Sequence, residues 1–284
     1  EGSRTFIEVN TSVSLEDLLR GMIIQSGNDA SVAIAEHVAG SEETFADLMN
    51  QYAEVLGMTS SSFRNSTGLP DPEHYMTARD AAIIARAIIA EFPAYYAFYS
   101  ERDFSYNDIT QQNRNSLLWR DSSVDGLKTG YTAAAGYCLV TSAERSGMRL
   151  ISVVMGTASA QARADASQAL LNYGFRFYET HKLYSGGQEV TTTRVWKGEP
   201  PMAALGLAED LYLTIPRGSY DSLAATMDVE PELTAPLQTD TPVGYVRVSL
   251  DGRSLSETPL VALHEVPEAG LWTRLRDGIT LWMQ

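Results

Sequence analysis

The sequence predicts an α+β domain, then a small all-β domain, then a terminal amphipathic helix. Up to about residue 178, apolar residues recur at the helical spacing and flank a group of strand patterns. From residue 183 to 265 the helical spacing is absent, and short β patterns are separated by Gly, Pro and Asp turns. We therefore expect domains at 1–178 and 183–265, followed by a helix at 266–284.

Composition narrows the class of protein. The 284 residues contain 21 Lys+Arg against 36 Asp+Glu, a net charge of −15, which disfavours nucleic acid as a partner. The single cysteine, Cys138, excludes an intrachain disulfide and is expected to be a small buried hydrophobe. The four histidines have no metal-ligand spacing, and there is no dinucleotide or Walker fingerprint, so we expect neither metal nor cofactor. No apolar run reaches the length of a membrane span.

The first half of the chain is expected to be mainly helical. Residues 5–9 have a strand-like pattern. Ser14 and Asp17 are spaced as a capping box, so a helix should follow them, and Gly27 is expected to end it. By the same kind of cap and breaker signals, further helices are expected at 29–38, between Ser41 and Gly57, and at 81–90.

Strand patterns dominate from about residue 124. A strand is expected at 124–130, and an antiparallel hairpin at 136–142 and 149–155, before a helix that starts at Arg163. The all-β domain is expected to be a small sandwich. Its strands are predicted at 189–196, 211–215, 223–229, 243–250 and 260–263.

The terminal helix is predicted to carry an apolar stripe with a polar reverse face. The stripe consists of Leu271, Trp272, Leu275, Ile279, Trp282 and Met283. Two tryptophans on one stripe favour a membrane interface, where the ring is half buried and its N–H stays hydrated. A packing helix docked on the sandwich is the alternative.

Two tripeptides carry the chemical signal. Ser26-Gly27-Asn28 lies in a turn between two predicted helices, and Lys128-Thr129-Gly130 lies in a predicted strand about a hundred residues later. Each alone is equally consistent with a plain turn or strand. Together they match the second and third signatures of the penicillin-interactive serine acyltransferases.

Further segments extend this match over essentially the whole chain. They are Gln25 to Ala30, Asn113-Arg114-Asn115, Val124 to Thr132, Gly174 to Phe177, and Leu213 to Gly218. With them the sequence resembles the D-alanyl-D-alanine carboxypeptidases of the penicillin-binding protein 5 type. The resemblance implies a penicillin-binding (β-lactamase-like) serine transferase domain. It also implies removal of the terminal D-Ala from peptidoglycan stem pentapeptides through an acyl-enzyme, and β-lactam binding by the complete enzyme.

The same resemblance implies roles for the catalytic residues. Ser26 would shuttle a proton to the leaving amine, Asn28 would hold the substrate amide, and Lys128 would supply positive charge. It further implies a bacterial periplasmic protein, peripheral on the outer face of the inner membrane through the helix at 266–284.

Substrate-binding residues follow from the resemblance as well. Thr129 and the strand edge at Gly130 would bind the substrate backbone and its carboxylate. Arg163 is expected to be the cation for that carboxylate, and Arg114 is a weaker candidate for the same role. The alternative for Arg163 is a solvated arginine in the first turn of a helix.

The sequence departs from the family at the nucleophile. A Ser-x-x-Lys motif is expected some tens of residues before Ser26, but the chain has only three lysines, Lys128, Lys182 and Lys197, and none follows a serine by three positions. We therefore interpret the chain as an N-terminally truncated carboxypeptidase that is inactive alone. The alternative is a catalytically dead peptidoglycan-binding or scaffold protein. A class A β-lactamase is disfavoured, because its Glu-x-x-Leu-Asn pattern is absent.

Overall fold

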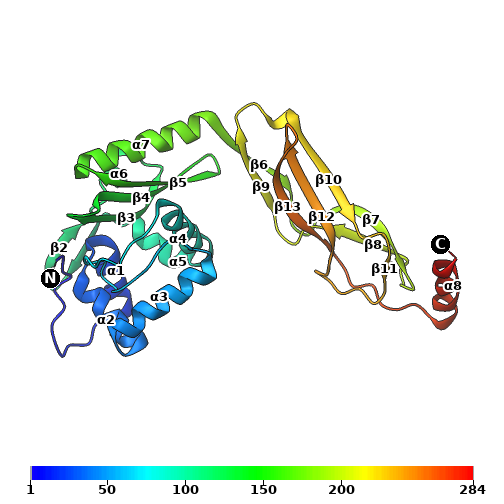
Figure 1. Cartoon of the computed structure of the whole chain (residues 1–284), viewed down its shortest axis with the longest axis horizontal. Coiled ribbons are helices and arrows are strands. Elements are labelled where there is room, and N and C mark those ends of the chain that lie inside the picture. The colour runs from blue at the N-terminus through cyan, green and yellow to red at the C-terminus, as the bar shows by residue number, and fades with distance from the viewer. Residues whose placement is uncertain (1, 284) are drawn as a thin grey trace. The chain divides into compact units, whose positions relative to one another are not determined.

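The computed structural model describes residues 2–283 and divides them into two compact units. The first unit ends at Arg176 and the second begins at Phe177. Glu1 and Gln284, the outermost residues of the predicted segments 1–178 and 266–284, lie outside the described residues. The first unit mixes helices with a sheet and the second is built from strands and one terminal helix, so the predicted fold class is confirmed (Figure 1).

The helices of the first unit follow the predicted caps. Ser14 Oγ accepts from Asp17 N at 3.0 Å, and Ser41 and Thr77 cap the third and fourth helices in the same way. These hydroxyls satisfy backbone donors that a helix start leaves without a partner. The helices are α1 (Leu15–Gln25), α2 (Asn28–Ala39), α3 (Glu42–Leu56), α4 (Ala78–Glu91), α5 (Pro93–Tyr96), α6 (Leu117–Arg120) and α7 (Ala160–Phe177), with a 3₁₀ turn η1 (Ala97–Ser100).

The strand expected at 5–9 is wrong. This segment has no sheet partner, because its backbone donors go to a side chain instead. Thr5 N and Phe6 N each donate to the Asp29 carboxylate at 2.8 Å, and Ile7 N donates to it at 3.2 Å. Asp29 lies in the first turn of α2, so the extended segment is tied to the start of that helix.

The central sheet of the first unit has three antiparallel strands in the order β3-β4-β5. Two elements outside the prediction form a separate hairpin, β1 (Asp103–Tyr106) with β2 (Ile109–Gln112). Leu139 of β4 packs with α6 and α7, and Leu127 of β3 packs with α4 and α5 through Ala85 and Tyr96. The sheet is therefore covered by helices on both faces (Figure 1). Its strands are β3 (Val124–Thr132), β4 (Gly136–Arg145) and β5 (Met148–Thr157).

The second unit holds a six-stranded sheet, β10-β12-β13-β8-β7-β11, and a two-stranded sheet, β6-β9. One core joins them. Val195, Leu205, Val246 and Leu260 from the larger sheet are fully buried in it, and Leu211 from the smaller sheet is mostly buried. The strands are β6 (Tyr178–Tyr184), β7 (Glu189–Trp196), β8 (Met202–Gly206), β9 (Leu211–Pro216), β10 (Leu223–Val229), β11 (Leu233–Thr234), β12 (Pro242–Leu250) and β13 (Arg253–Ala262), with a 3₁₀ turn η2 (Tyr220–Ser222) before β10.

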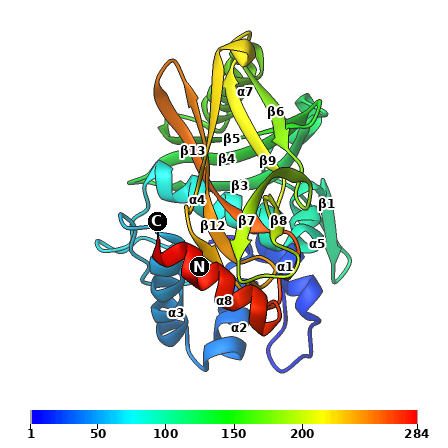
Figure 2. The same ribbon diagram turned by 90° about the vertical axis from the view of Figure 1, so that its right-hand side faces the viewer.

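The terminal helix α8 (Leu271–Trp282) presents its apolar stripe outward. Trp272 is 84 % exposed and Trp282 is 88 % exposed, whereas Asp277 is buried. The Asp277 carboxylate accepts from Lys197 N at 2.9 Å, just beyond the end of β7. Asp277 therefore joins α8 to the rest of the second unit near the end of β7 (Figure 2).

Among residues 2–283, no single helix combines the length and the apolar composition needed to cross a membrane. Only α4 and the segment Pro93–Ser100 meet that standard as a pair, and they are bent by 111°.

Candidate active site

The Ser26-Gly27-Asn28 turn is held by local backbone geometry. Ser26, not Gly27, ends α1: its φ of 60° and ψ of 43° are left-handed, and its N–H bonds to Gly21 O. Gly27 is required for a different reason. A Cβ there would lie 2.0 Å from Thr5 Oγ1, so the segment around Thr5 can pack on the turn only because Gly27 has no side chain. The turn is therefore held in place by its contacts with α1, α2 and the segment around Thr5.

Lys128 reaches this turn from the middle of β3. Its ammonium donates to Ser26 Oγ and, at 3.1 Å, to Thr129 O. Burial, with added repulsion from Arg114 and Arg163, lowers the pKa of Lys128 to about 8. The ammonium therefore remains mostly protonated at pH 7 but loses its proton far more readily than an ordinary lysine.

Arg163 is buried against the same strand. It is 7 % exposed, and its Nη1 donates to Gly130 O at 3.0 Å and to Cys138 O at 3.3 Å. Burial lowers its pKa, and its guanidinium lies 5.6 Å from the centre of the Tyr137 ring. A solvated arginine at a helix start is therefore excluded. Arg163 binds the backbone of β3 at Gly130, two residues after Lys128, and its positive charge acts on the Lys128 ammonium.

Arg114 comes close to the site from the segment before α6. With the Gln25 amide oriented to satisfy its neighbours, its oxygen accepts from Arg114 Nη2 at 3.0 Å and its nitrogen donates to Gln112 O at 3.3 Å. Gln25 directly precedes Ser26. The structure thus brings Arg114 and Lys128 to the same end of α1 from distant parts of the chain.

Two cavities adjoin these residues. Lys128, Thr129 and Gly130 line one of about 610 Å³, together with apolar residues of α4, β4 and β5. Asn28 lines another of about 790 Å³, with Asp29 among its other residues. The structure brings Ser26 and Lys128 into direct contact, but it places Asn28 and Lys128 on different cavities.

The strand that carries Lys128 is an edge strand. Among the described residues, β3 pairs only with β4, so its outer side has no strand partner. Thr129 is buried whereas Gly130 is exposed. Such an edge can accept an extended peptide through backbone hydrogen bonds.

Sequence reasoning missed one supporting residue and misjudged another. Asn115 is completely buried, and its Nδ2 donates to Gly126 O of β3 at 3.0 Å; it was visible only as a neighbour of Arg114 in the Asn-Arg-Asn segment. Cys138, expected to be buried, is partly exposed and lines the 610 Å³ cavity. Within residues 2–283, no group of three or more His, Cys, Asp or Glu is arranged to hold a metal ion.

Two family patterns match the chain. Residues 1–159 match D-alanyl-D-alanine carboxypeptidase, and residues 178–268 match the C-terminal domain of penicillin-binding protein 5. The chain belongs to the D-alanyl-D-alanine carboxypeptidase family. The carboxypeptidase DacC of Escherichia coli K12 is 44 % identical over 97 % of this chain and 70 % of its own length. DacA of Haemophilus influenzae is 42 % identical over 99 % of this chain and 72 % of its own length.

Solved structures of related proteins support the same family assignment. Penicillin-binding protein 5 from H. influenzae superimposes with a TM-score of 0.86 at 42 % identity, over 94 % of this chain and 79 % of the other. Penicillin-binding protein 6B from E. coli gives a TM-score of 0.71 at 34 % identity, over 92 % of this chain and 73 % of the other. The predicted family, fold class and serine-type D-Ala-D-Ala carboxypeptidase class are confirmed. This carboxypeptidase chain spans about 70 % of the length of the E. coli relatives.

Proposed function

We propose that the edge of β3 beside Ser26 and Lys128 binds peptidoglycan stem peptides that end in D-Ala-D-Ala. The observation that carries this proposal is the hydrogen bond from the Lys128 ammonium to Ser26 Oγ, made across 102 residues of sequence. A hydroxyl bonded to a cation of lowered pKa can pass a proton to a leaving amine and regain one from the cation. Ser26 is the proposed shuttle and Lys128 its proton partner.

The charges support recognition of an anion. Arg114 and Arg163 both act on Lys128 electrostatically, so three cations share one region. Among residues 2–283, none of the three forms an ion pair with a carboxylate. A substrate carboxylate would supply the missing counter-charge through charge-assisted hydrogen bonds. Thr129 and Gly130 are the proposed contacts for the peptide backbone on the open edge.

Asn28 is proposed to hold the substrate amide. It begins α2 directly after the turn, and its N–H donates to Ser3 O at 2.9 Å. Because its side chain lines the 790 Å³ cavity, we place the body of the stem peptide on that side of the turn and the terminal carboxylate on the arginine side.

Peptide binding tests the proposed site directly. A tripeptide ending in D-Ala-D-Ala should perturb the backbone amide signals of Thr129 and Gly130 in NMR titrations. Arg114→Gln should weaken the affinity of that peptide roughly 10- to 150-fold, since a charged hydrogen bond contributes about 1.5–3 kcal/mol. The same peptide with an amidated C-terminus is the control for the carboxylate. Equal binding of the acid and the amide would contradict the anion subsite.

Labelling by a penicillin distinguishes a carboxypeptidase from a catalytically dead peptidoglycan-binding protein. The 284-residue sequence contains no Ser-x-x-Lys, and acylation needs a serine with a resident base. The chain as given should therefore not be labelled by a fluorescent penicillin, and stoichiometric labelling would contradict this expectation. A chain extended upstream to include Ser-x-x-Lys should be labelled if the protein is a carboxypeptidase. A natural start near residue 1 with no such motif favours a catalytically dead peptidoglycan-binding protein.

We also propose that α8 holds the protein on the outer face of the bacterial inner membrane, in the periplasm. The support is the outward stripe, where Leu271, Ile279 and both tryptophans are each more than half exposed. The net charge of −15 makes attraction to anionic lipid a poor source of affinity. Deleting residues 270–284 should abolish flotation with liposomes at both low and high salt. Unchanged flotation would contradict the membrane role.

A further inference from the structure

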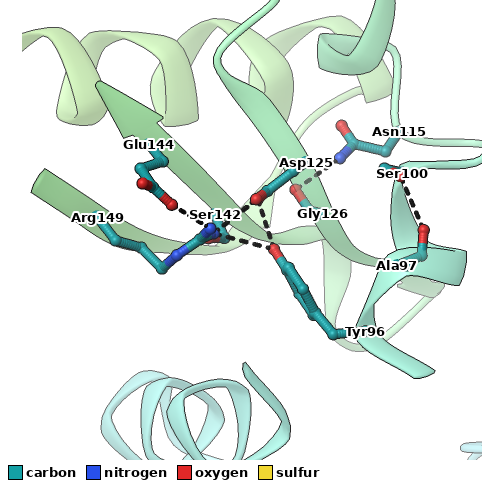
Figure 3. A network of polar contacts seen from close by, with 9 residues as sticks. All are labelled: Tyr96, Ala97, Ser100, Asn115, Asp125, Gly126, Ser142, Glu144 and Arg149. Carbon is teal, nitrogen blue, oxygen red and sulfur yellow. Dashed lines mark hydrogen bonds and ion pairs between the residues drawn. The ribbon is translucent and has the colours of Figure 1, made fainter. Parts of the chain in front are cut away.

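A polar network lies on β3 immediately before Lys128, and the proposed roles make no use of it. Figure 3 shows its centre, where Tyr96 Oη donates to Asp125 Oδ1 at 2.5 Å. Arg149 Nη1 donates to the same carboxylate at 2.7 Å and to Ser142 Oγ at 2.7 Å, and Arg149 Nη2 donates to Glu144 at 2.6 Å. The network therefore joins α5 to all three strands of the sheet.

Asp125 occupies an irregular position in the strand. The pairing of β3 with β4 shifts register between Val124 and Gly126, so Asp125 has no partner residue on β4. A bulge of this kind bends a strand and locally disrupts its backbone pairing. Here the side chains of Tyr96 and Arg149 hold the bulged residue from two sides.

The next residue, Gly126, is fixed as well. Asn115 Nδ2 donates to its carbonyl oxygen at 3.0 Å, and a Cβ on Gly126 would lie 2.8 Å from Tyr96 Oη. Tyr96 thus packs directly on the backbone of β3, and Leu127 beyond it packs in the same apolar cluster. Two residues are anchored within about 10 Å of strand upstream of Lys128, at about 3.3 Å per residue.

We propose that Tyr96, Asp125 and Arg149 form a positioning unit that fixes the bulged start of β3 and thereby holds the Lys128 ammonium against Ser26. The inference rests on the proposed role of Lys128. Burial and the hydrogen bond to Asp125 raise the pKa of Tyr96, so its hydroxyl remains a donor throughout the neutral range. The unit touches no reacting atom in this arrangement; it acts through the backbone of residues 125–128.

The titration of Lys128 is the readout that distinguishes positioning from general stability. The chain has only three lysines, so the ε-carbon signals of a lysine-labelled sample can be followed individually by NMR. Lys128 should titrate near 8, far below Lys182, whose pKa is raised by its contact with Asp210. If the strand loosens, Lys128 becomes more hydrated and its midpoint moves up toward the ordinary lysine value of about 10.4.

Three variants of the full chain test this. Tyr96→Phe removes one oxygen without changing charge, and Arg149→Lys keeps the charge but loses the paired donors. Each should raise the Lys128 midpoint by about one pH unit, which corresponds to a tenfold change in proton affinity. Asp125→Asn should raise it too, although removal of a negative charge acting only through space would lower it. Tyr95→Phe, on the exposed neighbour in α5, is the matched control and should leave it unchanged.

The outcomes are decisive in both directions. A raised Lys128 midpoint in the three variants, with Lys182 and the Tyr95→Phe chain unchanged, supports the positioning unit. A lower melting temperature with an unmoved Lys128 midpoint overturns it, as does a wild-type midpoint near 10.4. If Tyr96→Phe fails to fold, Ser142→Ala, which deletes one acceptor of Arg149, must show the same upward shift. Peptide binding by the wild-type chain is measured separately, so its failure would count against the proposed function and not against the positioning unit.

Discussion

Replacing Asp29 by alanine should release the segment 4–7 from the Ser26-Gly27-Asn28 turn. The Asp29 carboxylate accepts from three backbone donors of that segment, at 2.8, 2.8 and 3.2 Å. Thr5 is buried, so loss of its acceptor leaves an unsatisfied donor, which costs about 1–3 kcal/mol. Phe6 and Ile7 can turn to water, so their bonds contribute about 0.5–1.5 kcal/mol each. We expect the segment to be destabilised by about 2–6 kcal/mol in total.

Amide hydrogen exchange measures this release directly. A loss of about 2–6 kcal/mol corresponds to roughly 30- to 20,000-fold faster exchange at residues 5–7, provided that they exchange by local opening. Asp47→Ala, on the exposed side of α3, is the control for removal of a carboxylate from a neighbouring helix. Exchange at residues 5–7 within threefold of wild type would refute the reasoning that Asp29 ties this segment down.

Four further expectations follow from individual residues. Gly27→Ala should lower the free energy of unfolding by about 1–3 kcal/mol in urea titrations, because its methyl group would lie 2.0 Å from Thr5 Oγ1; an unchanged midpoint would contradict this. Binding of a D-Ala-D-Ala peptide should weaken as pH rises through about 8, where Lys128 loses its charge, and calorimetry at pH 7 and pH 9.5 checks it. Because the folded pKa of Lys128 lies below its unfolded value of about 10.4, the unfolded chain binds more protons between the two values, so this group should make stability rise with pH across that window. Asp277→Ala should remove the carboxylate that accepts from Lys197 N and speed exchange of that amide at least tenfold, whereas Arg276→Gln should not.

Local residue patterns predicted most of the helices and strands, and contacts between distant segments explain the predictions that were wrong. The strands at 189–196 and 223–229 have the predicted bounds, and the first is rich in Val and Thr, β-branched residues that favour strands. The strand predicted at 260–263 spans Arg253–Ala262. Residues 253–259 were missed because most of them are polar and none is buried, whereas the last three residues of the strand are buried. Residues 5–9 look like a strand, but the side chain of Asp29 supplies the hydrogen bonds that a partner strand would have given.

The candidate site was only partly predictable for a related reason. Ser26 and Lys128 could be paired because both belong to short recognisable tripeptides. Tyr96 and Arg149 belong to no motif, and their importance arises only when α5 and β5 meet the bulge in β3. Arg163 was expected by resemblance to be the cation for the substrate carboxylate, which stays a prediction; its burial against Gly130 O depends on how α7 packs on the sheet.

The three-stranded sheet is left open at both edges among the described residues, at β3 and at β5. An open edge, such as the one proposed to bind a stem peptide, is also a template on which a second copy of the chain can add a strand. Covering β3 would block the proposed peptide site, so a means other than covering the edge must keep copies of the chain apart if that proposal holds. The charge of −15 provides one, because like-charged copies repel one another before their edges meet. Since salt shortens that repulsion to about 10 Å at 0.1 M, solubility and access to the recognition edge are coupled through ionic strength.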